Sequence, residues 1–202
     1  AIADVSKNIA IGYGDMFIAG GVESMTRAPF VLPKAESAYS RAGQVYDTSI
    51  GWRVINPKLS ALYHPYTMGE TAENIAEKYG ITRQEQDEFA YKTQLNYQNA
   101  LNTNKFENEI IPVHIPQRKG DALVFQQDEH PRLSTVDQLS KLSAAFKSGG
   151  TVTAGNASGI NDGAAALLIV SEEALKRYNL EPIAEVVSSA AAGVPPEIMG
   201  IG

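Results

Sequence analysis

The chain has 202 residues, with 17 Lys and Arg against 23 Asp and Glu, which gives a formal net charge of -6. Hydrophobic residues make up 44% and charged residues 20%, a balance that can fill a core and excludes wholesale disorder. The acidic balance argues against a protein that coats nucleic acid or an anionic membrane, and the absence of cysteine removes disulfides, thiolate zinc sites and cysteine nucleophiles from this chain.

The apolar runs of the chain are short, and none reaches the ~20 residues that a membrane span needs. No charged and then apolar leader is visible either. We therefore expect a cytoplasmic protein without a membrane partner. Residue 1 lies inside a predicted helix and residues 195–202 read as an unfinished connection, so we also expect an internal piece of a larger subunit.

The N-terminal segment follows an α/β pattern. Ile2, Val5 and Ile9 are three and four positions apart, which predicts one face of a helix. The apolar run 16–19 then predicts a buried strand, and the glycines at 20–21 predict a turn at its end. Because the run is continuous and does not alternate, the strand suits a sheet that is covered on both faces.

The segment from about 26 to 66 is different in character, because prolines and aromatic residues recur and no helical or strand period persists. We expect an ordered excursion that packs on another surface, for which a neighbouring subunit is one candidate. Two helices are predicted next. The first spans 71–79 and ends at Gly80, a natural left-handed cap.

The second helix is predicted to begin at the capping box formed by Thr82 and Glu85 and to end near residue 102. Its buried stripe is predicted to consist of Phe89, Thr93, Tyr97 and Ala100. An edge strand at 110–115, a turn at 118–121 and a short helix at 136–146 follow, and the glycines at 149–150 end that helix.

The last third returns to the α/β pattern. A loop rich in glycine and small residues spans 151–163, and the run 164–170 predicts a buried strand. Ser171 predicts the cap of a helix that ends near Asn179, and 183–192 predicts a further strand. Segments of α/β character therefore bracket a long, mostly helical insertion.

The glycine-rich loop is the most distinctive local motif, since Gly155, Gly159 and Gly163 are four residues apart with small residues between them. It is neither a Walker loop nor a dinucleotide fingerprint, and it lacks the glycine spacing of a nucleophile elbow. A structural turn and a ligand loop remain equally good interpretations. The glycines at 20–21 follow a predicted strand, where α/β ligand sites form, but a sharp exit from the sheet is the preferred interpretation.

The ionisable residues predict no acid-base pair and no metal site. His64, His114 and His130 lie in loop-like sequence without the spacing of a helical metal pair, so we interpret them as solvent-facing. Four cations could contact a phosphate-bearing ligand, although each alone is typical of a solvated surface. They are Arg118, Lys119, Arg132 and Lys141.

Three motifs together resemble the thiolase family, whose members make or cleave 3-ketoacyl thioesters of coenzyme A. They are Ala-Gly-Gly-Val-Glu-Ser-Met at 19–25 followed by Ala28-Pro29, Met-Gly-Glu-Thr-Ala-Glu-Asn at 68–74, and the loop at 151–165. The resemblance runs along essentially the whole chain. In addition, the stretch 48–53 looks more like the degradative or aromatic-catabolic branch than the short-chain biosynthetic one.

The resemblance implies an α/β thiolase-like fold of two similar βαβαβαββ halves, with a mostly helical loop domain inserted in the N-terminal half. Residues 1–24 and 148–178 would then belong to the N-terminal core. Residues 25–147 would form the loop domain, and 179–202 would begin the C-terminal core. Members are homodimers or homotetramers, which makes the aromatic segment at 30–66 a natural assembly surface.

The family mechanism uses a nucleophilic cysteine, a second cysteine as acid/base, and histidine and asparagine side chains. This chain has no cysteine, so we expect no catalytic residue within it, no activity from it alone, and catalytic motifs on either side. Coenzyme A would be a substrate, and no other cofactor is implied. The resemblance assigns coenzyme A or acyl binding to Met68, Arg132, Phe146, Ala154, Gly155, Ser158, Ile160 and Met199.

Within that set, Met68 and Met199 match the acyl pocket, and Arg132 matches the adenine and phosphate end of coenzyme A. The other residues match the pantetheine channel. Thr67 stands where many members have histidine, and Ser143-Ala144 replaces a common Arg-Pro, so the acyl chain length stays open. We expect part of an acyltransferase that cleaves 3-ketoacyl-CoA or condenses acetyl-CoA. A non-catalytic acyl-CoA or lipid carrier and a structural assembly module are the alternatives.

Overall fold

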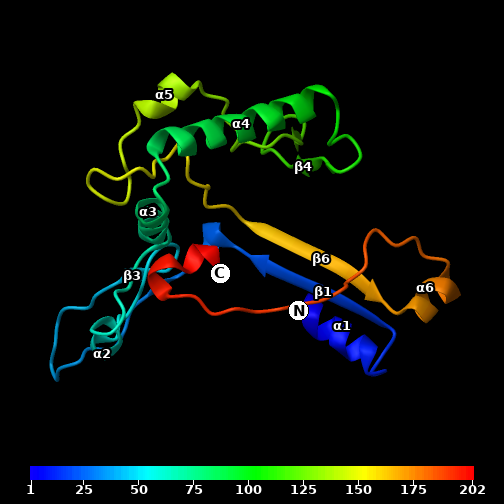
Figure 1. Ribbon diagram of the computed structural model, residues 1–202, viewed down its shortest axis with the longest axis horizontal. Coiled ribbons are helices and arrows are strands. Elements are labelled where there is room, and N and C mark those ends of the chain that lie inside the picture. The colour runs from blue at the N-terminus through cyan, green and yellow to red at the C-terminus, as the bar shows by residue number, and fades with distance from the viewer. The chain divides into compact units, whose positions relative to one another are not determined.

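The computed structural model describes residues 1–202, in which helices and strands are mixed as the predicted α/β class requires (Figure 1). The chain divides into two compact units. The first unit contains residues 1–65, 160–195 and 202, and the second contains 66–159 and 196–201.

The first unit is built on one pair of strands. Helix α1 (Ile2–Ala10) leads into β1 (Met16–Glu23), which pairs antiparallel with β6 (Gly163–Val170) along its whole length (Figure 1). The predicted helix and both predicted strands are confirmed. The predicted turn at the glycines 20–21 is wrong, because β1 continues through them. A Cβ at Gly20 would lie 2.7 Å from the carbonyl oxygen of Ala165, so this glycine permits a close approach of the two strands.

The two strands have little cover within this chain. Ala19 is the buried residue of β1, whereas Ile18 is 76% exposed and Val22 is 79% exposed. The expectation of a sheet covered on both faces is therefore not met by these 202 residues. The reason is that two strands and one short helix offer too few side chains to bury both faces of a sheet.

A pair of hydrogen bonds joins the segment that follows β1 to the segment that precedes β6. The backbone N–H of Thr26 donates to Asp162 at 2.8 Å, and its hydroxyl donates to the same carboxylate at 2.6 Å. The hydrogen bond from the Thr26 hydroxyl, followed by that from its backbone N–H, holds the pKa of the Asp162 carboxyl below its usual range. Thr26 lies in the short helix η1 (Met25–Arg27).

The rest of the segment up to residue 65 contains only short elements, in agreement with its lack of a persistent period. Strands β2 (Phe30–Val31) and β3 (Tyr46–Asp47) pair with each other, and helix α2 (Pro57–Ser60) is capped by the side chain of Asn56. The aromatic side chains of Phe30 and Tyr39 are exposed. These two aromatic side chains therefore have no covering surface within the chain, and the expectation that the segment packs on another surface stays a prediction.

The end of the first unit departs from the sequence prediction. Helix α6 (Glu172–Tyr178) is confirmed: the Ser171 hydroxyl accepts from the N–H of Ala174, and Asn179 ends the helix in the left-handed conformation. The predicted strand at 183–192 is wrong, because these residues form no regular element and Ile183 is fully exposed. A strand is stable only beside a partner, and none pairs with this segment.

The second unit is mostly helical. Helix α3 (Met68–Tyr79) begins earlier than predicted, because Thr67 and Glu70 form a capping box that the sequence analysis overlooked. It ends at Gly80 in the left-handed conformation, as predicted. Helix α4 (Arg83–Asn102) begins at the predicted capping box. The short helix η2 (Pro196–Ile201) packs on α3, where the Asn74 amide donates to the Glu197 carbonyl at 2.9 Å.

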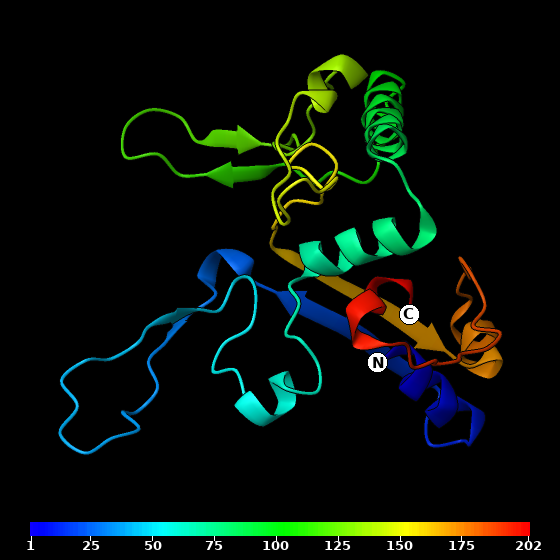
Figure 2. The ribbon, with the colours of Figure 1, turned by 60° about the vertical axis from the view of Figure 1, so that its left-hand side comes forward.

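The predicted edge strand and turn are confirmed as a hairpin, in which β4 (Val113–Ile115) pairs with β5 (Leu123–Phe125) (Figure 2). The helix predicted at 136–146 is shorter: α5 (Val136–Ser140) ends six residues early, and Ala144 instead forms a β-bridge with Thr153. No helix of the structure combines the length and apolar character that crossing a membrane would take.

Candidate functional site

The N-terminal half of α4 buries a polar face, so the predicted stripe is wrong at Phe89 and Thr93, whereas its other two members, Tyr97 and Ala100, are half-buried. Phe89 is 75% exposed and Thr93 is exposed, while Asp87 is buried and Arg83 and Gln86 are half-buried. Burial of charged and amide groups is tolerable only when they have hydrogen-bond partners. A hydrophobic pattern could not reveal this face, because its side chains are buried through hydrogen bonds and not through apolar area.

Helix α3 holds the start of the glycine-rich loop through one carboxylate. Glu73 is 4% exposed, and it accepts from the backbone N–H of Thr151 at 2.9 Å and from that of Val152 at 2.8 Å. The Thr151 hydroxyl is a third donor, at 3.1 Å. Gly150 makes the approach possible, because a Cβ there would lie 2.3 Å from a Glu73 carboxylate oxygen.

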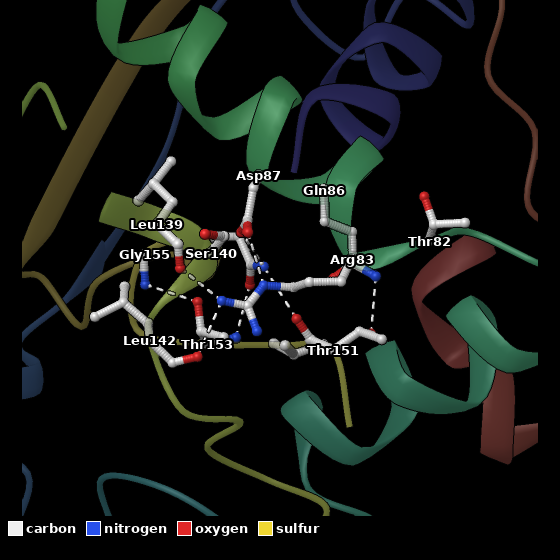
Figure 3. Close-up of polar contacts among 12 residues, drawn as sticks. Thr82, Arg83, Gln86, Asp87, Leu139, Ser140, Leu142, Thr151, Thr153 and Gly155 are labelled. Carbon is white, nitrogen blue, oxygen red and sulfur yellow. Dashed lines mark hydrogen bonds and ion pairs between the residues drawn. The ribbon is translucent and has the colours of Figure 1, made fainter. Parts of the chain in front are cut away.

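Helix α4 holds the same loop and α5 through a second carboxylate. Asp87 is 1% exposed and accepts from Nε of Arg83 at 2.8 Å (Figure 3). It also accepts from the amide of Asn156 at 3.0 Å. The same Arg83 guanidinium donates from Nη2 to the carbonyl oxygens of Leu139 at 2.6 Å and Leu142 at 3.0 Å. One planar guanidinium therefore connects α4 to the end of α5.

The loop also satisfies its own backbone groups. Thr153 is fully buried; its N–H donates to the Asn156 side-chain oxygen at 2.7 Å, and its hydroxyl accepts from the N–H of Gly155 at 3.1 Å. Gln86 of α4 donates to the Thr151 hydroxyl at 2.8 Å. These bonds support the structural-turn interpretation of residues 151–156, and the turn leaves Ala154 exposed on its outer side.

Phe146 packs on the beginning of α3, the helix that also carries Met68. The Phe146 ring lies directly on Gly69, where a Cβ would be 2.2 Å from a ring carbon. Met68 is the first residue of the same helix and is 67% exposed. Met199 lies in η2, which packs on α3, and it is partly exposed as well. The second unit thus presents apolar side chains around one helix.

The other predicted binding residues are more scattered. Gly155 faces α5, since a Cβ there would lie 2.6 Å from Leu142 and 2.7 Å from Leu139. Ser158 and Arg132 are exposed, and the backbone of Arg132 is tied to Gln94 of α4. Ile160 belongs to the first unit.

A separate cleft of about 560 Å³ lies elsewhere in the second unit. Its apolar lining comes from Leu101, Phe106, Ile110 and Pro112, and none of the predicted binding residues contributes to it. Nowhere in residues 1–202 do three His, Asp or Glu side chains gather closely enough to hold a metal ion. We therefore place the candidate site at α3 and the loop, where the predicted residues and the buried network meet.

The side chains that build this site were not among the predicted residues, although two signals in the sequence pointed to them. Glu73 lies inside the motif at 68–74, and Asp87 follows Arg83 by one helical turn, the spacing of an ion pair. Neither signal shows by itself that the carboxylate is buried. The partners Thr151 and Asn156 lie 78 and 69 positions further along the sequence, and only folding brings them to the two carboxylates.

Comparison with known proteins identifies the family. The family described as "Thiolase, N-terminal domain" matches residues 1–173. The chain belongs to the thiolase family. This thiolase chain is 52% identical over 201 residues to a β-ketoadipyl-CoA thiolase of Acinetobacter baylyi, covering 99% of the chain and 50% of that relative. It is 47% identical over 203 residues to the 3-oxoadipyl-CoA/3-oxo-5,6-dehydrosuberyl-CoA thiolase of Escherichia coli, covering 100% of the chain and 51% of the relative.

Solved structures agree with the thiolase fold. The acetyl-CoA acetyltransferase of Bacillus anthracis matches with a TM-score of 0.84 and 41% identity, over 100% of this chain and 50% of that one. Human mitochondrial 3-ketoacyl-CoA thiolase in complex with CoA matches with a TM-score of 0.81 and 34% identity, over 100% of this chain and 49% of that one. The thiolase chain thus spans about half the length of the relatives it matches, and the predicted family and fold class are confirmed.

Gly69 offers a direct test of the packing at α3. Alanine is normally better than glycine inside a helix by about 1 kcal/mol. Here the added Cβ would lie 2.2–2.4 Å from three Phe146 ring carbons, so the ring must move. We expect Gly69→Ala to destabilise the full-length protein by about 1–3 kcal/mol in urea unfolding, because overpacking outweighs the helix propensity.

The matched background for this test is Phe146→Leu, which removes the ring that Gly69 contacts. In that background the added methyl group should cost clearly less than in the parent, and a double-mutant cycle measures the difference. Equal costs in both backgrounds, or a Gly69→Ala protein more stable than its parent, would contradict the packing.

Proposed function

We propose that the full-length protein carrying this chain is an acyl-CoA acyltransferase, which cleaves a 3-oxoacyl-CoA with free coenzyme A or runs the condensation in reverse. The observation that carries the proposal is 52% identity to a β-ketoadipyl-CoA thiolase over 99% of the chain. The matching solved structure in complex with CoA supports coenzyme A as the substrate.

In the cleavage direction, a thiolate attacks the C3 carbonyl, and the bond between C2 and C3 breaks. The fragment with C1 and C2 leaves as acetyl-CoA after C2 takes a proton. The acyl group that begins at C3 passes from the first thiolate to the thiol of the second coenzyme A, whose proton is released. A thiolate serves as both nucleophile and leaving group. Since this chain has no cysteine, we propose that the reacting thiolates lie outside the 202 residues and that this chain contributes binding.

The proposed binding residues suit a long, mostly uncharged ligand. Met68 and Phe146 offer partly exposed apolar surface at α3, as the acyl group and pantetheine arm require. Exposed Arg132 suits the phosphates of coenzyme A. Ala154, Gly155 and Ser158 belong to the loop segment that the buried network holds, and Met199 and Ile160 complete the proposed set. Held in place by Glu73 and Asp87, the loop would lose little freedom when a ligand binds.

The test is a thiolysis assay of the full-length protein and of the 202-residue chain with 3-oxohexanoyl-CoA and free coenzyme A. We expect the full-length protein to produce acetyl-CoA and butyryl-CoA, and the chain alone to produce neither. A full-length protein that binds coenzyme A thioesters without turning them over in either direction would favour the non-catalytic carrier. Turnover by the 202-residue chain would refute the proposal that its thiolates lie elsewhere.

A further inference from the structure

Arg83 joins two parts of the second unit that are far apart in sequence. Its Nε donates to Asp87 at 2.8 Å, and its Nη2 donates to the carbonyl oxygens of Leu139 at 2.6 Å and Leu142 at 3.0 Å. The Arg83 side chain is 24% exposed and Asp87 is almost fully buried, so water competes little for these bonds. One guanidinium can hold both parts at once because its donors are fixed in a single plane.

The first branch of this link ends at Gly155 of the glycine-rich loop. A Cβ on Gly155 would lie 2.6 Å from Leu142 and 2.7 Å from Leu139, so the loop backbone passes directly against both side chains. These are the two residues whose carbonyl oxygens Arg83 holds. Leu139 is buried, and it cannot shift without disturbing the packing around it. Arg83 therefore fixes the wall against which Gly155 lies.

The second branch ends at the next residue, Asn156. Its amide nitrogen donates to Asp87 at 3.0 Å and to the carbonyl oxygen of Thr151 at 3.0 Å. Its side-chain oxygen accepts from the N–H of Thr153 at 2.7 Å. Because Asp87 is itself paired with Arg83, the position of Asn156 also depends on the guanidinium. Two consecutive residues of the loop are thus held through one side chain of α4.

The same loop has an open side. Ala154 and Ser158 are exposed, and together with Gly155 they are the loop residues proposed above to bind coenzyme A. These residues and Arg83 all belong to the second unit. A binding segment that is already held in its bound conformation loses less freedom when the ligand arrives, so affinity increases without any new contact. Arg83 can therefore influence a ligand through the loop.

We propose that Arg83 is a positioning residue for coenzyme A. By holding Asp87 and the end of α5 at the same time, it keeps the loop from Ala154 to Ser158 in the conformation that binds the coenzyme. The inference rests on the proposed acyltransferase function and adds a residue outside the proposed binding set. There are two rival explanations: the charge of Arg83 attracts the coenzyme phosphates from a distance, or Arg83 serves stability alone.

The experiment uses Arg83→Lys in the full-length protein, because lysine keeps the charge but its one nitrogen cannot replace Nε and Nη2 together. In thiolysis of 3-oxohexanoyl-CoA, KM for free coenzyme A should rise roughly 5- to 50-fold, because the loop is no longer held for binding. The kcat should stay within about twofold, since the chemical step is unchanged. The Kd of coenzyme A, measured by calorimetry, should rise as well. Lys92→Gln removes an exposed cation of the same helix and should change none of these values.

Two results would overturn the inference. A lower kcat with an unchanged KM in Arg83→Lys indicates a smaller folded fraction, which is the signature of a purely structural role. A KM raised equally by Lys92→Gln assigns the effect to charge. A parent that binds coenzyme A without turnover would reject the acyltransferase function, while the ratio of Kd values still tests the inference; a parent that does not bind it would reject both. If Arg83→Lys does not fold, Asp87→Asn weakens the same link and is measured in the same way.

Discussion

Replacing Asp87 by alanine should lower the free energy of unfolding by about 3–5 kcal/mol, because it leaves a partly buried charge and an amide without their partner. Arg83 donates to Asp87 at 2.8 Å and Asn156 donates at 3.0 Å, and the carboxylate is 1% exposed. Urea unfolding of the full-length protein, followed by circular dichroism, measures the loss. Asp87→Asn keeps one acceptor oxygen, so its loss should be smaller.

The matched control for this prediction is Asp137→Ala. Asp137 also pairs with a cation four residues away, since Lys141 lies at 2.6 Å, but both side chains are more than two-thirds exposed. Exposed pairs contribute little to stability, so the unfolding midpoint should hardly move. If the two alanine variants lost the same stability, the buried network would not be the element that holds α4 to the loop.

Replacing Glu73 by alanine should lower the free energy of unfolding by about 2–5 kcal/mol, because two backbone N–H groups and one hydroxyl lose their acceptor. The donors are Thr151 and Val152, both at the start of the loop. Amide hydrogen exchange should also accelerate at these two residues. Without the carboxylate their N–H groups have no hydrogen bond to α3, so the loop opens more easily. Glu73→Gln retains one acceptor oxygen, so its free energy of unfolding should lie between those of the parent and Glu73→Ala.

Glu77→Ala is the control on the same helix, one turn further along. Glu77 pairs with Lys147 at 2.7 Å and is mostly exposed, so its removal should leave both the unfolding midpoint and the exchange of Thr151 and Val152 close to the parent. Unchanged amide exchange in Glu73→Ala would contradict the proposed tie between α3 and the loop.

Local signals were enough to predict the parts of the fold that depend on neighbouring residues. The capping box of Thr82 and Glu85, the cap at Ser171 and the left-handed Gly80 each involve groups a few residues apart, and all are confirmed. The missed start of α3 was equally local, because Thr67 and Glu70 follow the same rule.

The remaining features depend on partners that are far away in sequence. Glu73 is buried because the loop 78 positions later brings its N–H groups. The segment 183–192 is apolar enough for a strand, but it has no neighbour to pair with. The same limit applies to the site. Family resemblance selected Met68 and Phe146, yet only the structure shows that Gly69 lets the ring lie against the beginning of α3.

The pairing of β1 with β6 has a consequence for how the protein is made. Thr26 and Asp162, which lie just beyond the paired ends, are 136 positions apart, so β1 leaves the ribosome long before its partner exists. At about 5–20 residues per second, the delay is roughly 7–27 s. Throughout this time the strand Met16–Glu23 keeps an open hydrogen-bonding edge and an apolar sequence. We expect the nascent chain to depend on chaperones during this interval, until synthesis of β6 lets the strands pair.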